Sequence, residues 1–310
     1  MAFLFVLPTW PVAVWTAAMR KVAPGLDIRV WPDAMGRIED IEYVAAWLPP
    51  PDVVRSLPNL KAIFSLGAGV DHLLMGDGPL PDVPIVRLVD KALTTDMTQY
   101  VIHWVLHFHR GMHRHRESQL EGKWRRLPYP EVAKRRVGIL GAGVLGGDAA
   151  RKLAEFGFDV AVWSRTPTQI EGVQSYHGTI NLIPFLGRSE ILVNLLPLTP
   201  ETKGLLHWKS LLALPRGAFL INGARGAHLV DADLISALDS GHVEAAALDV
   251  FAPEPLAAGH AFWKHPRVFV TPHVASTTTA RTAAIEIANN IRRIEAGQAP
   301  TNVADPALKY

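Results

Sequence analysis

Hydrophobic residues along the chain fall into short continuous runs, separated by longer stretches in which they recur at helical spacing. In chain order, the runs predict strands at 3–7, 28–31, 43–48, 61–66, 84–88, 135–140, 159–163, 190–196, 217–221, 244–250 and 267–271. Continuous apolar strands that alternate with helices are typical of parallel sheets covered by helices on both faces. We therefore predict an α/β protein with two doubly wound parallel-sheet domains.

A long helical stretch, residues 94–122, separates the two series of strands, so we expect a domain boundary near it. The last helical pattern, residues 276–297, follows the final strand and has no strand after it. We expect this helix to pack back on the first domain. The expected division is therefore a discontinuous domain of residues 1–103 and 276–310 around a second domain of residues 104–275.

Composition narrows the class of protein. The 310 residues are 49% hydrophobic, which is enough for a large core, and a net charge of +2 gives no reason to expect nucleic acid or an anionic membrane as a partner. The absence of cysteine excludes disulfides and thiolate chemistry. The apolar N-terminus lacks a basic region and soon meets Pro8, so we interpret it as a strand rather than a signal peptide. No apolar run reaches the roughly 18 residues of a membrane span, and we expect a cytoplasmic enzyme.

A glycine-rich turn follows the strand at 135–140 and opens an amphipathic helix. Gly141, Gly143 and Gly146 have the spacing G-x-G-x-x-G, which permits a tight turn, close approach of a pyrophosphate, and close packing of helix on strand. The backbone from Gly143 through Val144 and Leu145 to Gly146 forms the helix N-terminus, where amide groups attract phosphate. This context predicts a dinucleotide site.

The end of the next strand distinguishes between the two dinucleotides. An NAD enzyme usually has Asp or Glu there, but this chain has Ser164, Arg165 and Thr166. A carboxylate would repel the 2′-phosphate of NADP, whereas an arginine can pair with it and hydroxyls can donate to it. We predict NADPH in preference to NADH; the alternative is that Arg165 is a solvated loop residue.

Charged side chains follow three of the later predicted strands. Arg225 comes just after the buried strand at 217–221, where a guanidinium that never loses its charge requires an anion. Asp249 and Glu254 follow the next strand, and His273 follows the last one. Ligands of open α/β sheets collect at such strand ends. Each residue alone has a structural explanation, but arginine, glutamate and histidine in this order after a glycine loop predict a catalytic set.

The set of motifs resembles that of the D-isomer-specific 2-hydroxyacid dehydrogenases, most closely their glyoxylate/hydroxypyruvate reductase A branch. The resemblance runs through "SLGAGVDHL", "GILGAGVLG", "NLLPLTPET", "INGARG", "LDVFAPEPL" and "TPHVA", and covers nearly the whole chain. It implies a Rossmann NAD(P)-binding domain inserted in a flavodoxin-like substrate domain, with the active site in the cleft between them. It also implies that Arg225, Glu254 and His273 are catalytic, and that glyoxylate and hydroxypyruvate are substrates.

The resemblance implies an NAD(P) cofactor, of which Ser164, Arg165 and Thr166 favour NADP, and it adds contacts at the ends of other strands. These expected contacts are Leu196, Pro197, Asn222, Gly223, Ala224, Asp249 and Ala275.

Reduction of a 2-oxo acid delivers hydride to the carbonyl carbon and leaves charge on the oxygen. His273 is expected to donate the proton, with Glu254 fixing its tautomer and favouring the imidazolium. Arg225 offers a planar fork of donors to the carboxylate and carbonyl of the substrate.

A second part of the substrate site is expected in the first domain. Gly67 and Gly69 loosen the backbone of "SLGAGVDHL", and the amides of Gly69 and Val70 are expected to point outward at a helix start. Trp47 is expected to narrow the pocket. An ordinary turn and core packing are the structural alternatives.

Two further features, Gln99 and a histidine-rich stretch, have no assigned part in the expected reaction. Gln99 stands where many family members have glutamate, and we interpret it as structural. The histidine-rich stretch 103–115 has pairs at helical spacing, but no carboxylate flanks them as in a hydrolytic zinc helix, so we predict no metal. By resemblance, this helix contributes to a homodimer interface.

Other functions remain possible for the same motifs. One is a dinucleotide-sensing corepressor built on this fold with a retained catalytic set, and another is a reductase of a bulkier 2-oxo acid. A formate dehydrogenase is disfavoured, because Gln rather than Glu254 is expected beside the histidine in that branch.

Overall fold

The computed structural model describes residues 1–305, and the chain divides into two compact units. Unit 1 comprises Met1–Leu93 together with the chain from Thr278 onward, and unit 2 comprises Thr94–Thr277. The boundary predicted between residues 103 and 104 falls in the middle of helix α3 (Lys91–His109), whereas the structure divides the chain near the start of this helix. Within residues 1–305, no helix is both long and apolar enough to cross a membrane.

Unit 1 is built on a parallel sheet of five strands. They are β1 (Ala2–Val6), β2 (Asp27–Val30), β3 (Ile41–Ala46), β4 (Ala62–Ser65) and β5 (Ile85–Arg87). Their order in the sheet is β2-β1-β3-β4-β5, which is the flavodoxin-like order. The helices of this unit are α1 (Val12–Val22), α2 (Pro51–Arg55) and α9 (Ala280–Glu295).

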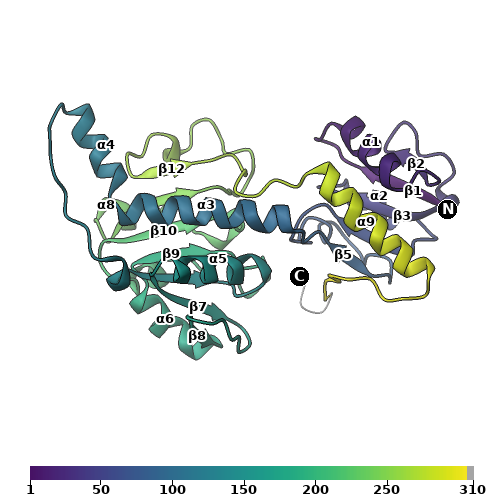
Figure 1. The fold of residues 1–310 in the computed structure, drawn as a ribbon. Helices are drawn as coiled ribbons and strands as arrows, with labels where there is room; N and C mark the ends of the chain where they lie inside the picture. The colour runs from purple at the N-terminus through teal and green to yellow at the C-terminus, as the bar shows by residue number, and fades with distance from the viewer. Residues whose placement is uncertain (306–310) are drawn as a thin grey trace. The chain divides into compact units, whose positions relative to one another are not determined.

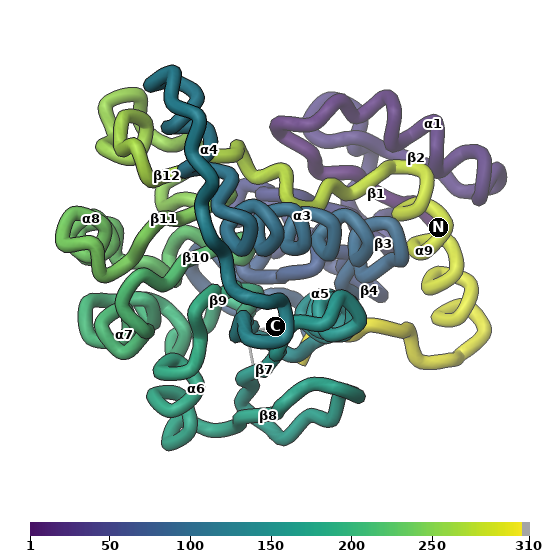
Figure 2. Tube along the Cα trace, turned by 60° about the vertical axis from the view of Figure 1, so that its left-hand side comes forward, coloured from purple at the N-terminus to yellow at the C-terminus, as the bar shows by residue number. Residues whose placement is uncertain are grey.

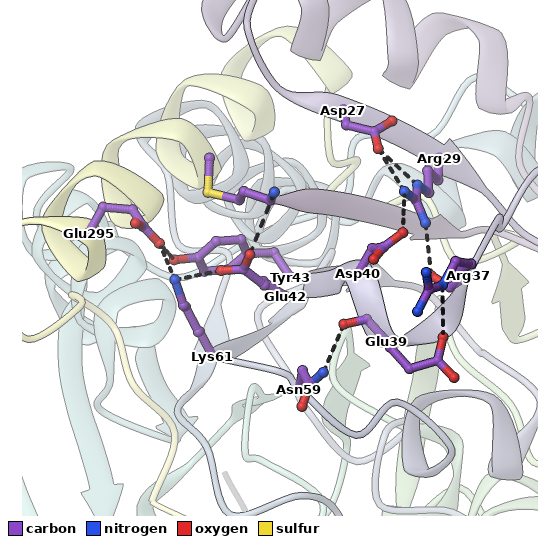
Figure 3. Close-up of polar contacts among 11 residues, drawn as sticks. Asp27, Arg29, Arg37, Glu39, Asp40, Glu42, Tyr43, Asn59, Lys61 and Glu295 are labelled. Atoms are coloured by element: carbon purple, nitrogen blue, oxygen red, sulfur yellow. Dashed lines mark hydrogen bonds and ion pairs between the residues drawn. The ribbon is translucent and has the colours of Figure 1, made fainter.

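Helix α9 belongs to unit 1 because its apolar face completes one side of that sheet (Figures 1 and 2). Alanines and isoleucines of α9, including Ile287 and Ile291, share a core with α1 and with one face of the strands. Polar contacts fix its far end: the hydroxyl of Tyr43 donates to Glu295 at 2.5 Å, and Lys61 donates to the same carboxylate at 2.8 Å (Figure 3). The sequence after the last strand thus returns to the first strands of the chain.

Unit 2 contains a parallel sheet of seven strands. They are β6 (Arg136–Leu140), β7 (Asp159–Ser164), β8 (Gln174–His177), β9 (Ile191–Asn194), β10 (Ala218–Asn222), β11 (Val243–Leu248) and β12 (Val268–Val270). The order is β12-β11-β10-β9-β6-β7-β8, the dinucleotide-binding arrangement with one strand added at an edge. The helices that follow α3 are α4 (Met112–Leu120), α5 (Val144–Glu155), α6 (Leu182–Arg188), α7 (Trp208–Leu212) and α8 (Asp231–Asp239).

Helices cover both faces of the seven-stranded sheet (Figure 1). Helices α3 and α5 pack on one face, where alternate strand residues such as Val137, Ile139 and Val193 point. Helices α6, α7 and α8 pack on the other face against the intervening residues, such as Leu192 and Leu220. This double covering explains why the strands read as continuous apolar runs.

Three local expectations differ from the structure. Strand β8 was not predicted, because its residues "QSYH" are polar and mostly exposed at the edge of the sheet. The helical stretch 94–122 is two helices, α3 and α4, with Gly111 between them at a φ of 63°. The helix expected after Gly69 is only a turn, in which the Leu73 amide donates to the Val70 carbonyl at 2.9 Å.

Candidate active site

The three predicted catalytic residues follow three neighbouring strands of unit 2. Arg225 follows β10, Glu254 follows β11, and His273 follows β12. These strands are adjacent in the order β12-β11-β10 and all parallel, so their carboxyl ends meet at one edge of the sheet. The topology therefore brings the three loops together.

His273 and Glu254 form a direct pair. The ring Nδ1 of His273 lies 2.8 Å from Oε2 of Glu254, and the two side chains keep 32% and 36% of their surface exposed. Because the carboxylate accepts, Nδ1 carries a proton, and Nε2 is the ring nitrogen that can exchange a proton with a substrate. The other carboxylate oxygen, Oε1, accepts from the amide of Phe251 at 2.9 Å, which fixes the orientation of Glu254.

The environment of Glu254 favours the ionised carboxylate. Burial acts to raise the pKa of Glu254, but the bonds from His273 and the Phe251 amide, and the charges of His273 and Arg225, outweigh it and lower that pKa. The arrangement keeps a negative charge beside the imidazole at neutral pH. The contribution of Arg225 shows that its charge lies within electrostatic range of this pair.

Arg225 is partly buried on a loop that packs closely against the Glu254 loop. One guanidinium nitrogen donates to the carbonyl of Ala224 at 2.8 Å. The next residue, Gly226, is so close to Phe251 that a Cβ at this position would lie 2.0 Å from the carbonyl carbon of Phe251. Only glycine fits, and this contact couples the loop of Arg225 to the residue that holds Glu254.

Asp249 fixes the loop of His273 through hydrogen bonds. Its side chain is fully buried and accepts from the hydroxyl of Thr271 at 2.6 Å and from the amides of Val274 and Ala275 at 2.9 and 2.8 Å. Its carbonyl accepts from the His273 amide at 2.8 Å. These bonds support a φ of 56° at His273, a conformation that is unfavourable for a residue with a Cβ.

The bond network continues from Asp249 to helix α3. The hydroxyls of Tyr100 and Thr271 lie 2.9 Å apart, and burial raises the pKa of Tyr100. Neither residue was identified from the sequence. Thr271 could have been found, because it is a polar residue at the end of an apolar strand two positions before His273. No sequence pattern marks Tyr100.

The glycine loop has room for a pyrophosphate. Gly143 is the N-cap of α5, no side chain caps this helix, and a Cβ at Gly143 would meet nothing within 4 Å. The amides of Val144, Leu145 and Gly146 lie in the first turn, where they have no partner within the helix. Gly141 has a φ of 101°, and a Cβ there would lie 2.7 Å from the carbonyl oxygen of Leu195. The residues present fit a dinucleotide phosphate group.

The residues expected to select NADPH lie at the end of β7. Ser164 is partly buried and donates to the carbonyl of Thr166 at 2.7 Å, which tightens the turn. Arg165 and Thr166 are exposed. No carboxylate follows this strand in the sequence until Glu171.

Most of the other residues expected to contact the cofactor have buried side chains. Asn222 and Asp249 are fully buried, and Leu196, Ala224 and Ala275 nearly so. Pro197 and Gly223 are partly exposed. The structure thus places these residues at the carboxyl edge, where several of them shape loops with buried side chains.

The residues expected to bind substrate in unit 1 lie after β3 and β4. Trp47 stacks on Trp10 with ring centroids 5.2 Å apart and lies 4.6 Å from the ring of His72. A Cβ on Gly67 would be 2.5 Å from the Trp47 ring. The hydroxyl of Ser65 donates to the carbonyl of Gly69 at 2.7 Å. Because Val70 opens a turn rather than a helix, the expected helix dipole does not contribute at Gly69 and Val70.

The histidine-rich stretch forms an aromatic cluster. His107 packs among Trp104, Phe108 and Phe269, and its ring is stacked on that of His113 with centroids 6.0 Å apart. Burial and the charges of His113 and His103 lower the pKa of His107 to about 4. Across residues 1–305, no group of three or more potential ligand side chains is placed to hold a metal ion.

The fold and the site define an NAD(P)-dependent 2-hydroxyacid dehydrogenase. Residues 102–275 match the family model described as "D-isomer specific 2-hydroxyacid dehydrogenase, NAD binding domain". The chain belongs to this family. The family predicted from the motifs, and the two parallel-sheet domains predicted with it, are confirmed.

Two curated relatives are similar over their full lengths. They are the glyoxylate/hydroxypyruvate reductase A proteins of Serratia proteamaculans and Yersinia enterocolitica, each 42% identical over 315 aligned positions, covering 100% of both chains. A solved D-isomer specific 2-hydroxyacid dehydrogenase from Xanthobacter autotrophicus Py2, in complex with NADPH and MES, is 45% identical with a TM-score of 0.96, covering 100% of this chain and 99% of that one. An NADPH-dependent glyoxylate/hydroxypyruvate reductase from Sinorhizobium meliloti, with NADP and sulfate, is 40% identical with a TM-score of 0.93 and the same coverage.

Proposed function

We propose that the protein is an NADPH-preferring reductase that converts small 2-oxo acids, such as glyoxylate and hydroxypyruvate, to 2-hydroxy acids. The names of the full-length relatives and the NADPH and NADP in the solved neighbours support this activity. The start of α5, which no side chain caps, supports the binding of a dinucleotide, and the absence of a carboxylate in "SRT" at the end of β7 supports the preference for NADPH. The observation that carries the proposal is the His273–Glu254 pair at 2.8 Å on the strand edge shared with Arg225.

Each side chain has one part in the proposed reaction. Bound NADPH supplies the hydride to the carbonyl carbon. His273 donates a proton from Nε2 to the carbonyl oxygen, on which negative charge develops during reduction. Glu254 accepts a hydrogen bond from Nδ1–H of His273, which fixes the orientation of the ring and stabilises the imidazolium that donates the proton. Arg225 binds the substrate carboxylate and carbonyl with its fork of donors, so that the carbonyl is held for attack.

Further residues complete the proposed site. Gly141, Gly143, Val144, Leu145 and Gly146 are proposed to hold the pyrophosphate, and the turn at 164–166 the 2′-phosphate. The proposed contacts to the remainder of the cofactor come from Leu196, Pro197, Asn222, Gly223, Ala224, Asp249 and Ala275, through backbone atoms where the side chain is buried. In unit 1, the amides of Gly69 and Val70 are proposed to bind the substrate carboxylate, and Trp47 to limit substrate size.

The test is oxidation of NADPH, measured by its absorbance, with and without glyoxylate, hydroxypyruvate and a bulkier 2-oxo acid. We expect oxidation only when a 2-oxo acid is present, and faster reaction with the two small acids. Tight binding of NADPH without turnover of any of them would instead support the corepressor alternative.

We also propose that the enzyme is a cytoplasmic homodimer, assembled through the region of α3 and α4. Leu120 at the end of α4 is 72% exposed, and Trp124 just beyond it is 95% exposed. Large apolar side chains at this exposure mark interaction surfaces when they gather in one segment. Light scattering of the wild type and of Trp124→Ser should show a dimer that the substitution weakens.

A further inference from the structure

Three polar side chains are fully buried where β9 and β10 end. Asn194 is the last residue of β9, Asn222 is the last residue of β10, and His228 lies in the short helical turn Gly226–His228 that follows Arg225. All three have an exposed fraction of 0%. Polar groups at this depth require partners, and here they meet one another.

Backbone groups set the orientation of each side chain. The Leu196 amide donates to Oδ1 of Asn194 at 3.3 Å, so the amide nitrogen of Asn194 is the donor to Oδ1 of Asn222 and to Nδ1 of His228, both at 3.0 Å. Because Nδ1 of His228 accepts, it carries no proton. The other ring nitrogen, Nε2, lies 3.2 Å from the carbonyl of Pro197, which can only accept, so Nε2 carries the proton. The geometry requires a neutral imidazole of one tautomer.

These bonds connect two loops with different proposed tasks. On one side, His228 and Asn194 hold residues 195–197, whose Leu195 carbonyl lies against Gly141 of the glycine loop. On the other side, the amide nitrogen of Asn222 donates to the carbonyl of Arg225 at 3.2 Å. A shift of either loop would break a bond in the buried network.

We propose that His228 is a positioning residue for the reaction, and that together with Asn194 and Asn222 it forms a buried clasp that sets the 195–197 loop relative to the Arg225 loop. The proposal rests on the proposed function, because it takes residues 195–197 as a cofactor contact and Arg225 as the substrate anchor. His228 touches neither ligand in this proposal. It acts through the carbonyl of Pro197 and the amide of Asn194.

Two substitutions separate the two ring nitrogens of His228. In His228→Asn, the side-chain oxygen replaces Nδ1 and keeps the acceptor for Asn194, but no group reaches the Pro197 carbonyl. In His228→Gln, the amide nitrogen replaces Nε2 and keeps the donor to Pro197. We expect His228→Asn to raise the Kd and KM for NADPH by roughly twofold to tenfold, the range of one neutral hydrogen bond, and to leave kcat nearly unchanged. His228→Gln should keep the wild-type Kd and KM for NADPH.

His242 offers a matched control in the same unit. Its Nε2 lies 3.1 Å from the carbonyl of Leu214, but at the amino edge of the sheet, just before β11. His242→Asn removes a bond of the same kind and should leave the Kd for NADPH unchanged. The proposal is overturned if His228→Asn binds NADPH as tightly as wild type. It is also overturned if His228→Gln and His228→Asn lose affinity equally and in step with their melting temperatures, since that is a purely structural effect.

Nitrogen NMR of the wild type tests the tautomer without any substitution that could prevent folding. With histidine labelled at both ring nitrogens and the His228→Gln spectrum for assignment, His228 should show a protonated Nε2 and an unprotonated Nδ1. A protonated Nδ1 would overturn the clasp. The Kd for NADPH and the NMR spectrum are both independent of turnover, so a protein that binds NADPH but reduces no 2-oxo acid would refute the proposed function and leave the clasp standing.

Discussion

Removing the charge of Glu254 should shift the pH dependence of reduction to lower pH. In the structure, Oε2 of Glu254 lies 2.8 Å from Nδ1 of His273, and Oε1 accepts from the Phe251 amide. Glu254→Gln preserves the shape of the side chain but has one acceptor in place of two. Either the Phe251 amide or the imidazole must then face the NH2 group, and the imidazolium loses its counter-charge in both cases.

The size of the shift follows from the exposure of the pair. A hydrogen bond to a charged group contributes about 1.5–3 kcal/mol, and each 1.36 kcal/mol corresponds to one pH unit of titration. The two side chains keep 32% and 36% of their surface exposed, so solvent screening places the pair near the lower end of that range. We therefore expect reductase activity in Glu254→Gln to fall at a pH about one unit lower than in wild type.

The assay is kcat/KM for glyoxylate with NADPH from pH 5 to 10, together with oxidation of a 2-hydroxy acid over the same range. Reduction needs protonated His273 and is lost as pH rises, whereas oxidation needs the neutral imidazole and is gained as pH rises. Both transitions should move down together in Glu254→Gln. Asp239→Asn is the control, since Asp239 lies 3.3 Å from His265 at the opposite edge of the sheet. Coincident profiles for Glu254→Gln and wild type would refute the reasoning.

Three further predictions concern the anchor, the cofactor and acid stability. Arg225→Lys keeps the charge but loses the fork, so kcat/KM for glyoxylate should fall roughly 10–150-fold; a folded variant within about threefold of wild type would show that Arg225 is structural. Arg165 is exposed, so Arg165→Ala should raise the KM for NADPH by only about tenfold and leave that for NADH unchanged in steady-state kinetics. The pKa of His107 is lowered to about 4, so the unfolded chain binds protons more readily, and stability is lost as pH falls below about 6.5. The melting temperature should drop from pH 7 to pH 5, and less so in His107→Phe.

The fold could be predicted from the sequence because it depends on local signals. Strands buried on both faces are continuous apolar runs, and the glycine spacing after the strand at 135–140 indicates a dinucleotide loop. Strand β8 could not be predicted from the apolar pattern, because an exposed edge strand pairs through its backbone and needs no apolar side chains. The break between α3 and α4 is a single glycine in a long helical pattern, where a left-handed conformation depends on the chain around it.

The three proposed catalytic residues have a signal in the sequence, whereas the buried residues that hold their loops have none. Arg225, Glu254 and His273 are polar residues after apolar strands, and this pattern is visible in the sequence. His228 and Asn194 look like an ordinary loop histidine and an ordinary strand asparagine. Asn194 bonds to His228, 34 residues away, and His228 bonds to the Pro197 carbonyl, 31 residues away, and only the strand order makes these residues neighbours. A contact of this kind has no local signal.

A layer of buried polar groups lies beneath the three proposed catalytic residues. Asp249 holds the loop of His273 with four hydrogen bonds, and Asn222 holds the carbonyl of Arg225. These anchors are more buried than the residues they position, so water cannot replace a bond that a substitution removes. We therefore expect the proposed chemistry at the edge of the sheet to be sensitive to changes in its interior. An isosteric exchange at either anchor should alter turnover although neither side chain carries a proton or a charge to the substrate.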